Sequence, residues 1–220
     1  MISEKLSNSA SGSTLDSLLK SAQPKAKPTQ GRALVTYNRL LDSAADIITE
    51  GGLEGLNTNA VAAAAGVNVS TLYGYFTDKY ALMAGLLERF QATQLAMTSI
   101  ELDENSDKSL RVERLTDGLL AAFLQAPWVL SLNDALLSSP RLEPLREASL
   151  QQMVEQLMAQ LQVRDDTPEI PPEQQRASFR MLLEVYLSGM RLAVKAESPM
   201  REQIISEFKC LINSYLNNYR

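Results

Sequence analysis

The stretch VAAAAGVNVSTLYGYFTDK, residues 61–79, constrains the fold more strongly than any other part of the chain. Four consecutive alanines give a helix an almost bare surface, so a second helix backbone can approach it closely. Gly66 follows them and permits the positive φ angle of a tight turn. Beyond the turn, Leu72 and Phe76 lie four residues apart and supply one inner helical face. The stretch therefore predicts two short helices that cross closely at a sharp turn.

The residues on either side extend this helical pattern. Before the turn, apolar residues recur at positions i, i+4, i+7 and i+11, which places them on one face of a helix from Thr36. These residues are Tyr37, Leu41, Ala44 and Ile48. The pair Gly51-Gly52 can end this helix. The next three helices are expected at about 58–65, at 69–75 and from near Asp78. Their predicted N-caps are Asn57 or Thr58, Asn68 and Thr77.

The remainder of the chain has a helical pattern throughout, with breaks at polar and proline-containing segments. The predicted helices cover about 78–99, 108–125, 127–138, 142–163, 173–196 and 199–218. No long stretch alternates with a period of two, so the predicted fold class is all-α. We expect an N-terminal three-helix domain at 32–80 that contains a helix-turn-helix, followed by a larger helical domain at 81–220. The basic, serine-rich segment 1–31 has too few apolar groups to fold and is predicted to be a disordered tail.

Residue usage excludes several kinds of catalytic and metal site. The chain has no histidine and only one cysteine, Cys210. This usage rules out thiol–imidazole catalysis, the usual zinc sites and an intrachain disulfide. No paired acidic motif in a loop or glycine-rich setting replaces them. We therefore expect no enzyme activity, no metal and no cofactor.

Charge and hydropathy limit the partners of the chain. The first residues lack the apolar core of a signal peptide, and no run of about 18 apolar residues could span a membrane. We therefore expect a cytoplasmic protein with no membrane partner. Residues 24–90 have six basic and six acidic side chains, whereas residues 91–220 have 13 and 18, so the net charge of −5 lies in the second part. A neutral front and an acidic body indicate two parts with different functions.

The polar residues around the turn point outward if Leu72 and Phe76 point inward. In a helix-turn-helix, the second helix enters the major groove of DNA, and residues near its N-terminus read base edges. Residues 54–87 resemble the DNA-binding segment of the tetracycline-repressor (TetR) family of bacterial regulators. The resemblance covers about residues 33–88. The matching features are Thr58, Ala62, Gly66-Val67, Thr71-Leu72-Tyr73, Tyr75-Phe76, Lys79 and Ala81-Leu82.

The resemblance implies which residues contact double-stranded DNA. Thr58 and Lys79 correspond to positions that contact phosphates. Tyr73 and Tyr75 correspond to aromatic positions that contact phosphates or thymine methyl groups, and Asn59 to a position that can reach a base. The complete predicted set is Thr58, Asn59, Asn68, Val69, Ser70, Thr71, Tyr73, Tyr75 and Lys79.

Three residues of this segment depart from the family pattern. Val69, Gly74 and Thr77 stand where many relatives have a polar, bulky or basic residue. We therefore expect fewer charged contacts from the recognition helix, and a contact between Val69 and a thymine methyl group. The basic segment KAKPTQGR (25–32) either compensates by reaching phosphates or the minor groove, or is a solvated linker.

The last two predicted helices have a wider apolar surface than one packed face requires. Such helices can contact both their own domain and a second copy of it. The resemblance likewise implies a homodimer that forms through a four-helix bundle of these helices. The predicted interface residues are Phe179, Leu183, Leu187, Ile205, Phe208, Ile212 and Leu216.

Methionine and aromatic residues also gather in the helices of the second domain. The resemblance implies a cavity for a small-molecule effector in this region, and these side chains line apolar sites well. The same spacing also fits an ordinary core, so both interpretations stay open. The candidate ligand-binding residues are Phe123, Trp128, Met153, Met181 and Tyr186. We expect the effector to be apolar or aromatic.

These features favour a dimeric, ligand-responsive transcriptional regulator. In this hypothesis the chain represses by binding a palindromic operator, and a small apolar or aromatic molecule releases it. The alternative is an all-α interaction or adaptor protein that keeps the helix-turn-helix only as a scaffold. Indifference to any double-stranded DNA at low salt would favour the alternative.

Overall fold

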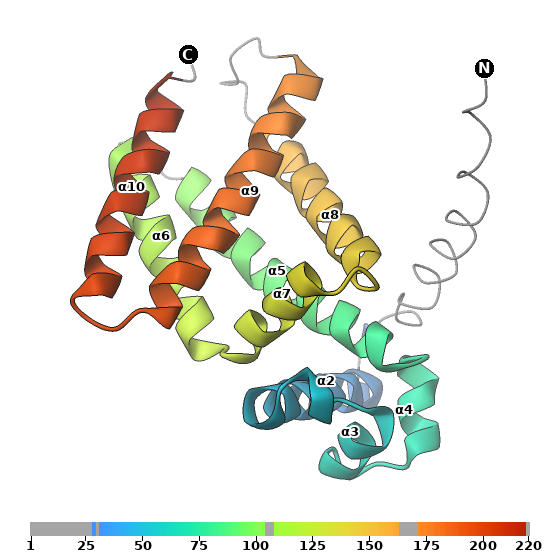
Figure 1. The fold of residues 1–220 in the computed structure, drawn as a ribbon. Coiled ribbons are helices and arrows are strands. Elements are labelled where there is room, and N and C mark those ends of the chain that lie inside the picture. Colours follow the sequence, from blue (N-terminus) through green and yellow to red (C-terminus); the bar gives the residue numbers. More distant parts are fainter. Residues whose placement is uncertain (1–27, 30, 104–107, 163–170, 219–220) are drawn as a thin grey trace, which may run out of the picture. The chain divides into compact units, whose positions relative to one another are not determined.

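The computed structural model describes residues 28, 29, 31–103, 108–162 and 171–218, and every regular element within them is a helix (Figure 1). In chain order the elements are α2 (Gly31–Gly51), the short 3₁₀ helix η1 (Leu53–Gly55), α3 (Thr58–Ala64), α4 (Val69–Tyr75), α5 (Lys79–Asp103), α6 (Lys108–Gln125), α7 (Trp128–Ser138), α8 (Glu143–Gln162), α9 (Pro172–Lys195) and α10 (Met200–Asn218). The predicted all-α class is confirmed. Nearly all of the predicted tail, 1–31, lies outside the described residues.

The helices from α6 to α10 begin and end within one residue of their predicted bounds. The start of α2 differs more, because this helix begins at Gly31 and not at Thr36. The hydroxyl of Thr36 donates to the carbonyl oxygen of Arg32, at 3.0 Å, inside the first turns of the helix. The apolar face begins only at Tyr37, so a prediction based on that face starts the helix too late.

The described residues divide into two compact units. The first unit contains the residues up to Glu88 together with Ser131–Ser149. The second contains Arg89–Leu130 and the residues from Leu150 onward. The predicted domain boundary between residues 80 and 81 falls inside α5, within the first unit, and stays a prediction.

The core of the first unit is built on one face of α2. The four residues predicted for that face are each at most 1% exposed. The ring of Tyr37 stacks on that of Phe76, with centroids 4.9 Å apart. Gly85 of α5 lies so close that a Cβ atom there would be 3.1 Å from the Phe76 ring and 3.2 Å from the Tyr37 hydroxyl. This packing fixes the end of α4 and the start of α5 against α2.

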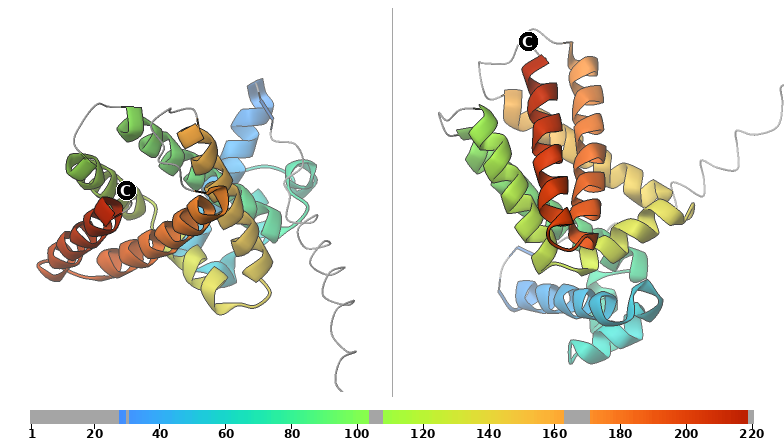
Figure 2. Two further views of the ribbon diagram at one scale, coloured as in Figure 1. Left: turned by 90° about the horizontal axis from the view of Figure 1, so that it is seen from above. Right: turned by 60° about the vertical axis from the view of Figure 1, so that its left-hand side comes forward.

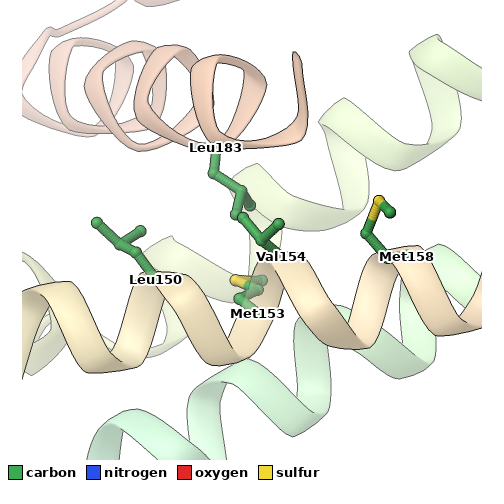
Figure 3. Close-up of a cluster of buried hydrophobic side chains, with 5 residues drawn as sticks. All are labelled: Leu150, Met153, Val154, Met158 and Leu183. Atoms are coloured by element: carbon green, nitrogen blue, oxygen red, sulfur yellow. The ribbon is translucent and has the colours of Figure 1, made fainter. Parts of the chain in front are cut away.

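The second unit has an apolar interior with two recognisable parts. In one part, the rings of Phe123 and Trp128 both pack edge-on to Phe90, with centroids 4.9 and 5.9 Å away. The other part is a cluster between α8 and α9 (Figure 3). Its buried members are Leu150, Met153, Val154, Met158 and Leu183.

Helices α9 and α10 lie side by side in the second unit (Figure 2). Their approach depends on Gly189, where a Cβ atom would be only 2.6 Å from the ring of Phe208. Arg201 closes the turn between them, because its Nε–H donates to the carbonyl oxygens of Ala193 and Ala196, each at 3.1 Å. A glycine contact and a shared cap therefore hold the pair together.

Candidate nucleic-acid interface

The turn between α3 and α4 has the geometry that its sequence predicts. Asn57 caps α3, because its side-chain oxygen accepts a hydrogen bond from the backbone N–H of Ala60 at 2.9 Å. Gly66 then adopts a φ of 61°, in the left-handed region that favours glycine. The backbone N–H of Val67 donates to the carbonyl oxygen of Ala62 at 3.0 Å. The two short helices are thus joined by a closely bonded turn.

Asn68 begins the second of these helices, as predicted. Its Oδ1 atom accepts hydrogen bonds from both the backbone N–H and the hydroxyl of Ser70, each at 3.0 Å. One side-chain oxygen therefore satisfies an unpaired amide of the first turn and also orients the serine. The start of α4 is held in place before any partner arrives.

The two sides of α4 differ sharply in burial. Leu72 and Phe76 have no exposed surface, and Ala62 of α3 and its C-cap residue Ala65 are also buried. The opposite side carries polar side chains and is open to solvent. Its exposed residues include Asn68, Ser70, Thr71 and Tyr73, together with Asn59 of α3. Leu72 and Phe76 therefore point inward and the polar side chains around the turn point outward, as predicted.

Thr58 and Tyr73 meet across the two helices. The Thr58 Oγ1 and Tyr73 hydroxyl oxygen atoms lie 3.1 Å apart and share a hydrogen bond. The ring of Tyr73 is 43% exposed, so the pair lies at the surface. Two residues that were predicted to contact DNA separately thus form one hydroxyl pair that links α3 to α4.

Three residues of the predicted set, Thr58, Val69 and Tyr75, are half-buried, whereas the others are exposed. The ring of Tyr75 packs edge-on to Tyr37, with centroids 6.2 Å apart and planes at 71°. Tyr75 therefore contributes to the core of the first unit as well as to the surface.

The cap of α5 corrects a prediction. Asp78, not Thr77, caps this helix, since its Oδ1 accepts from the backbone N–H groups of Tyr80 at 2.8 Å and Ala81 at 2.9 Å. A carboxylate therefore already occupies two of the amides that could bind a phosphate at this helix end. Lys79, the exposed first residue of α5, can offer its side-chain ammonium to an anion.

Tyr80 and Arg141 form a contact that the sequence did not predict. The Lys79 ammonium lies 5.7 Å from the centroid of the Tyr80 ring, and the Arg141 guanidinium lies 5.1 Å from it. Arg141 comes from the turn between α7 and α8, within the first unit. Some 60 residues separate it from Tyr80, so no local spacing could indicate the contact.

Two models of known protein families match this chain. Residues 40–86 match the model for bacterial regulatory proteins of the tetR family, and residues 109–216 match the model for a tetracyclin repressor-like C-terminal domain. The chain belongs to the TetR family. Members of the TetR family are DNA-binding regulators and not enzymes.

Individual relatives agree with this assignment. Over 110 residues the chain is 28% identical to the HTH-type transcriptional repressor DrrR1 of Streptomyces coeruleorubidus, a match that covers 50% of this chain and 40% of DrrR1. A TetR-family regulator from Streptomyces coelicolor superposes with a TM-score of 0.60 at 23% identity, covering 84% of this chain and 99% of that one. Another from Syntrophomonas wolfei gives a TM-score of 0.62 at 16% identity, with 82% and 94% covered. The solved structures share the fold.

The candidate effector residues of this TetR-family chain lie in its second unit, and four of them are mostly buried. Phe123 and Trp128 belong to the aromatic group with Phe90, and Met153 to the cluster between α8 and α9. The Tyr186 hydroxyl lies 3.4 Å from the Thr116 Oγ1. Burial raises the pKa of Tyr186, and this hydrogen bond opposes part of the rise.

Met181 does not belong with the other candidate effector residues. Its side chain is 60% exposed on α9, so it cannot line an interior site in the single chain. The sequence suggested Met181 because methionine and aromatic residues gather in this domain, but residue type does not show which side of a helix is buried.

The predicted dimer interface also needs correction. Leu183, Ile205, Phe208 and Ile212 are each less than 10% exposed within one chain, so a second copy could not contact them without opening the unit. Phe179 and Leu187 are partly buried against the cluster between α8 and α9, and Leu216 is half-buried. The apolar side chains that the two helices do expose are Met181, Leu192, Met200 and Leu211. Cys210 of α10 is also exposed.

Within the part of the chain that the structure describes, no group of three or more potential metal ligands gathers closely enough to hold an ion. No single described helix is both long and apolar enough to cross a bilayer, and α6 with α7 meets that test only as a bent pair.

Proposed function

We propose that this chain is a dimeric transcriptional repressor that binds a palindromic operator and releases it when a small apolar or aromatic effector binds. The observation that carries the proposal is the outer side of α4. Small polar side chains point away from a fully buried inner side and are held by a capped turn. Such side chains suit the donors, acceptors and methyl groups on base edges in the major groove.

The contacts to bases would come from the first turn of α4. Ser70 and Thr71 offer hydroxyl groups, and Val69 offers methyl groups to a thymine. Because both hydrogen bonds of Asn68 use its oxygen, its amide NH₂ group stays suited to donate to a base edge or a phosphate. Asn59 of α3 is exposed and can supply a further polar contact.

The contacts to phosphates would come from both helices and from α5. The hydroxyl pair of Thr58 and Tyr73 offers a bonded, preoriented donor to one phosphate. Lys79 adds a charge, and Tyr75 adds the exposed part of its ring. Phosphate contacts of this kind fix the position of a protein on DNA, whereas base contacts provide specificity.

Dimerisation is supported by the exposed apolar side chains of α9 and α10. Met181 and Leu192 lie eleven residues apart on α9, which places them on the same side of that helix. Met200 and Leu211 have the same spacing on α10. A second copy packed on these stripes would remove them from water. A twofold dimer then presents two copies of α4 to successive major grooves, about 34–36 Å apart.

Effector binding is supported by the composition of the second unit. The same unit contains buried aromatic rings and methionines together with a small number of buried polar groups, among them Gln94, Thr116 and the Tyr186 hydroxyl. A mainly apolar site with few polar groups suits an apolar or aromatic molecule. Such a molecule would act only if it binds the DNA-free state more tightly than the DNA-bound one.

The test is a selection of random duplex DNA on the purified full-length chain, at low and at moderate salt. We expect enrichment of a palindromic site whose half-sites lie about one helical turn apart. The double variant Ser70→Ala, Thr71→Ala should fold normally, since both side chains are exposed, and should fail to enrich that site. The enriched duplex can then be used to screen for the effector that releases it.

One observation favours the adaptor alternative. The exposed side of α4 has no basic side chain, and the whole chain has a sequence pI of about 4.9. If no duplex is enriched at either salt concentration, the helix-turn-helix is only a scaffold and the adaptor function takes precedence.

A further inference from the structure

Gly74 is the sixth of the seven residues of α4, and its own chain does not require a glycine there. Its φ angle is not positive, so any L-residue could adopt its backbone conformation. A Cβ atom at this position would meet no neighbouring side chain or packed backbone within 4 Å. Neither strain nor packing inside the described chain explains the missing side chain.

Four other glycines of the chain each have a structural reason to lack a side chain. Gly52 and Gly66 have positive φ angles at turns. Gly85 and Gly189 lie against aromatic rings that a Cβ atom would crowd. Gly74 has neither property, and it lies in a helix of only two turns, where glycine is disfavoured relative to alanine. The first unit therefore carries a destabilising residue at a site where alanine would fit.

The position of Gly74 shows which surface gains from the missing side chain. Residues three and four apart are neighbours on a helix, so Gly74 lies beside Thr71 and Ser70 on the exposed side of α4. It is also next to Tyr73, whose hydroxyl is fixed by Thr58. The missing side chain of Gly74 leaves open space over the main chain of α4, here called the notch, at the end of the helix away from its first turn.

We propose that the sugar–phosphate backbone of one operator strand enters this notch and approaches the main chain of α4 more closely than any side chain would permit. The inference rests on the proposed function and adds a positioning residue to it. Glycine allows close approach of a backbone to a ligand at a cost in helix stability. Since the contact is to the backbone, it would set how deeply α4 sits in the groove without reading sequence.

The experiment compares Gly74→Ala with wild type on the duplex that wild type enriches from a random pool. Gly51→Ala is the matched control, because Gly51 is also exposed, lies in a helix and has nothing within 4 Å of a built Cβ atom. Melting temperature is measured on the free proteins, and affinity is measured by fluorescence anisotropy of the labelled duplex.

We expect Gly74→Ala to melt roughly 2 °C higher than wild type, because alanine favours the helix. We also expect it to bind at least tenfold more weakly, by the same factor on the enriched site and on its single-base variants. Gly51→Ala should bind like wild type. This combination of a more stable protein and weaker binding would support the inference.

Three results would overturn it. Unchanged or tighter binding by Gly74→Ala would show that no DNA atom occupies the notch. A lower melting temperature would show that the chain itself needs the glycine, and a loss confined to one base pair would indicate base reading. If wild type enriches no duplex at all, the proposed function fails first, and that outcome is distinguishable because it appears before any variant is compared.

Discussion

Lys79 contributes a single charge at a helix end where the backbone N–H groups of Tyr80 and Ala81 are already bonded to Asp78. Its ammonium would therefore interact with a phosphate as a point charge, without help from these two amides. We predict that Lys79→Ala weakens operator binding and reduces the slope of log K against log salt by about 0.9. The slope is measured by anisotropy titrations over a range of salt concentrations.

Arg146→Ala is the control for this charge. Arg146 lies in the same unit and is paired with Glu147 at 2.8 Å, so its loss should leave the slope unchanged. An equal reduction in both variants would mean that the effect comes from net charge and not from a contact.

At the residue scale, the sequence predicted the outward polar residues of α4 correctly, because Leu72 and Phe76 settle which side is buried. It could not predict that Arg141 lies over Tyr80, since chain folding alone brings them together.

Among the helices, the cap of α5 gives a direct comparison between the predicted and the observed residue. Asp78→Ala removes the acceptor of two backbone N–H groups and should lower the free energy of unfolding by about 1 kcal/mol. Thr77→Ala, at the residue that the sequence predicted as the cap, should lower it by less, because neither hydrogen bond of the cap involves Thr77. Urea unfolding followed by circular dichroism measures both. A larger loss at Thr77 would contradict the observed cap.

The contact between α9 and α10 makes a second prediction at this scale. Gly189→Ala places a methyl group where a Cβ atom would be 2.6 Å from the Phe208 ring. The overpacking should cost about 1–3 kcal/mol of stability, measured in the same way. Gly118→Ala is the control, because its nearest neighbour, the Met97 sulfur, is 3.8 Å away and a methyl group fits. Equal stability of the two variants would contradict the close contact between Gly189 and the Phe208 ring.

Helix positions followed from sequence because proline, glycine and capping residues mark most ends locally. Sequence did not show which apolar side chains of α9 and α10 are buried within the chain, although it showed that both helices have wide apolar surfaces. Those surfaces are used largely within one chain: Leu183 packs on α8, and Phe208 packs on Gly189 and Tyr186. Sequence shows how much of a helix is apolar, but the neighbours within the fold decide which part stays free.

For the whole molecule, we predict a dimer that forms through the exposed apolar side chains of α9 and α10, which are Met181, Leu192, Met200 and Leu211. Leu192→Glu together with Met181→Glu should convert the dimer to monomer in sedimentation velocity, because each change buries a carboxylate in an apolar contact. Leu137→Glu is the control, since Leu137 is comparably exposed but lies on α7. The exposed Cys210 of α10 offers an independent check. A short bis-maleimide should link two copies of wild type but not of the double variant.

The most direct test of DNA recognition by two copies of α4 is a hydroxyl-radical footprint of the full-length chain on its enriched duplex. We predict two protected patches on one face of the duplex, about one helical turn apart and related by the palindrome. Both patches should disappear with the Ser70→Ala, Thr71→Ala variant. A single patch, or protection that survives this variant, would contradict the claim that a dimer reads DNA through the outer side of α4.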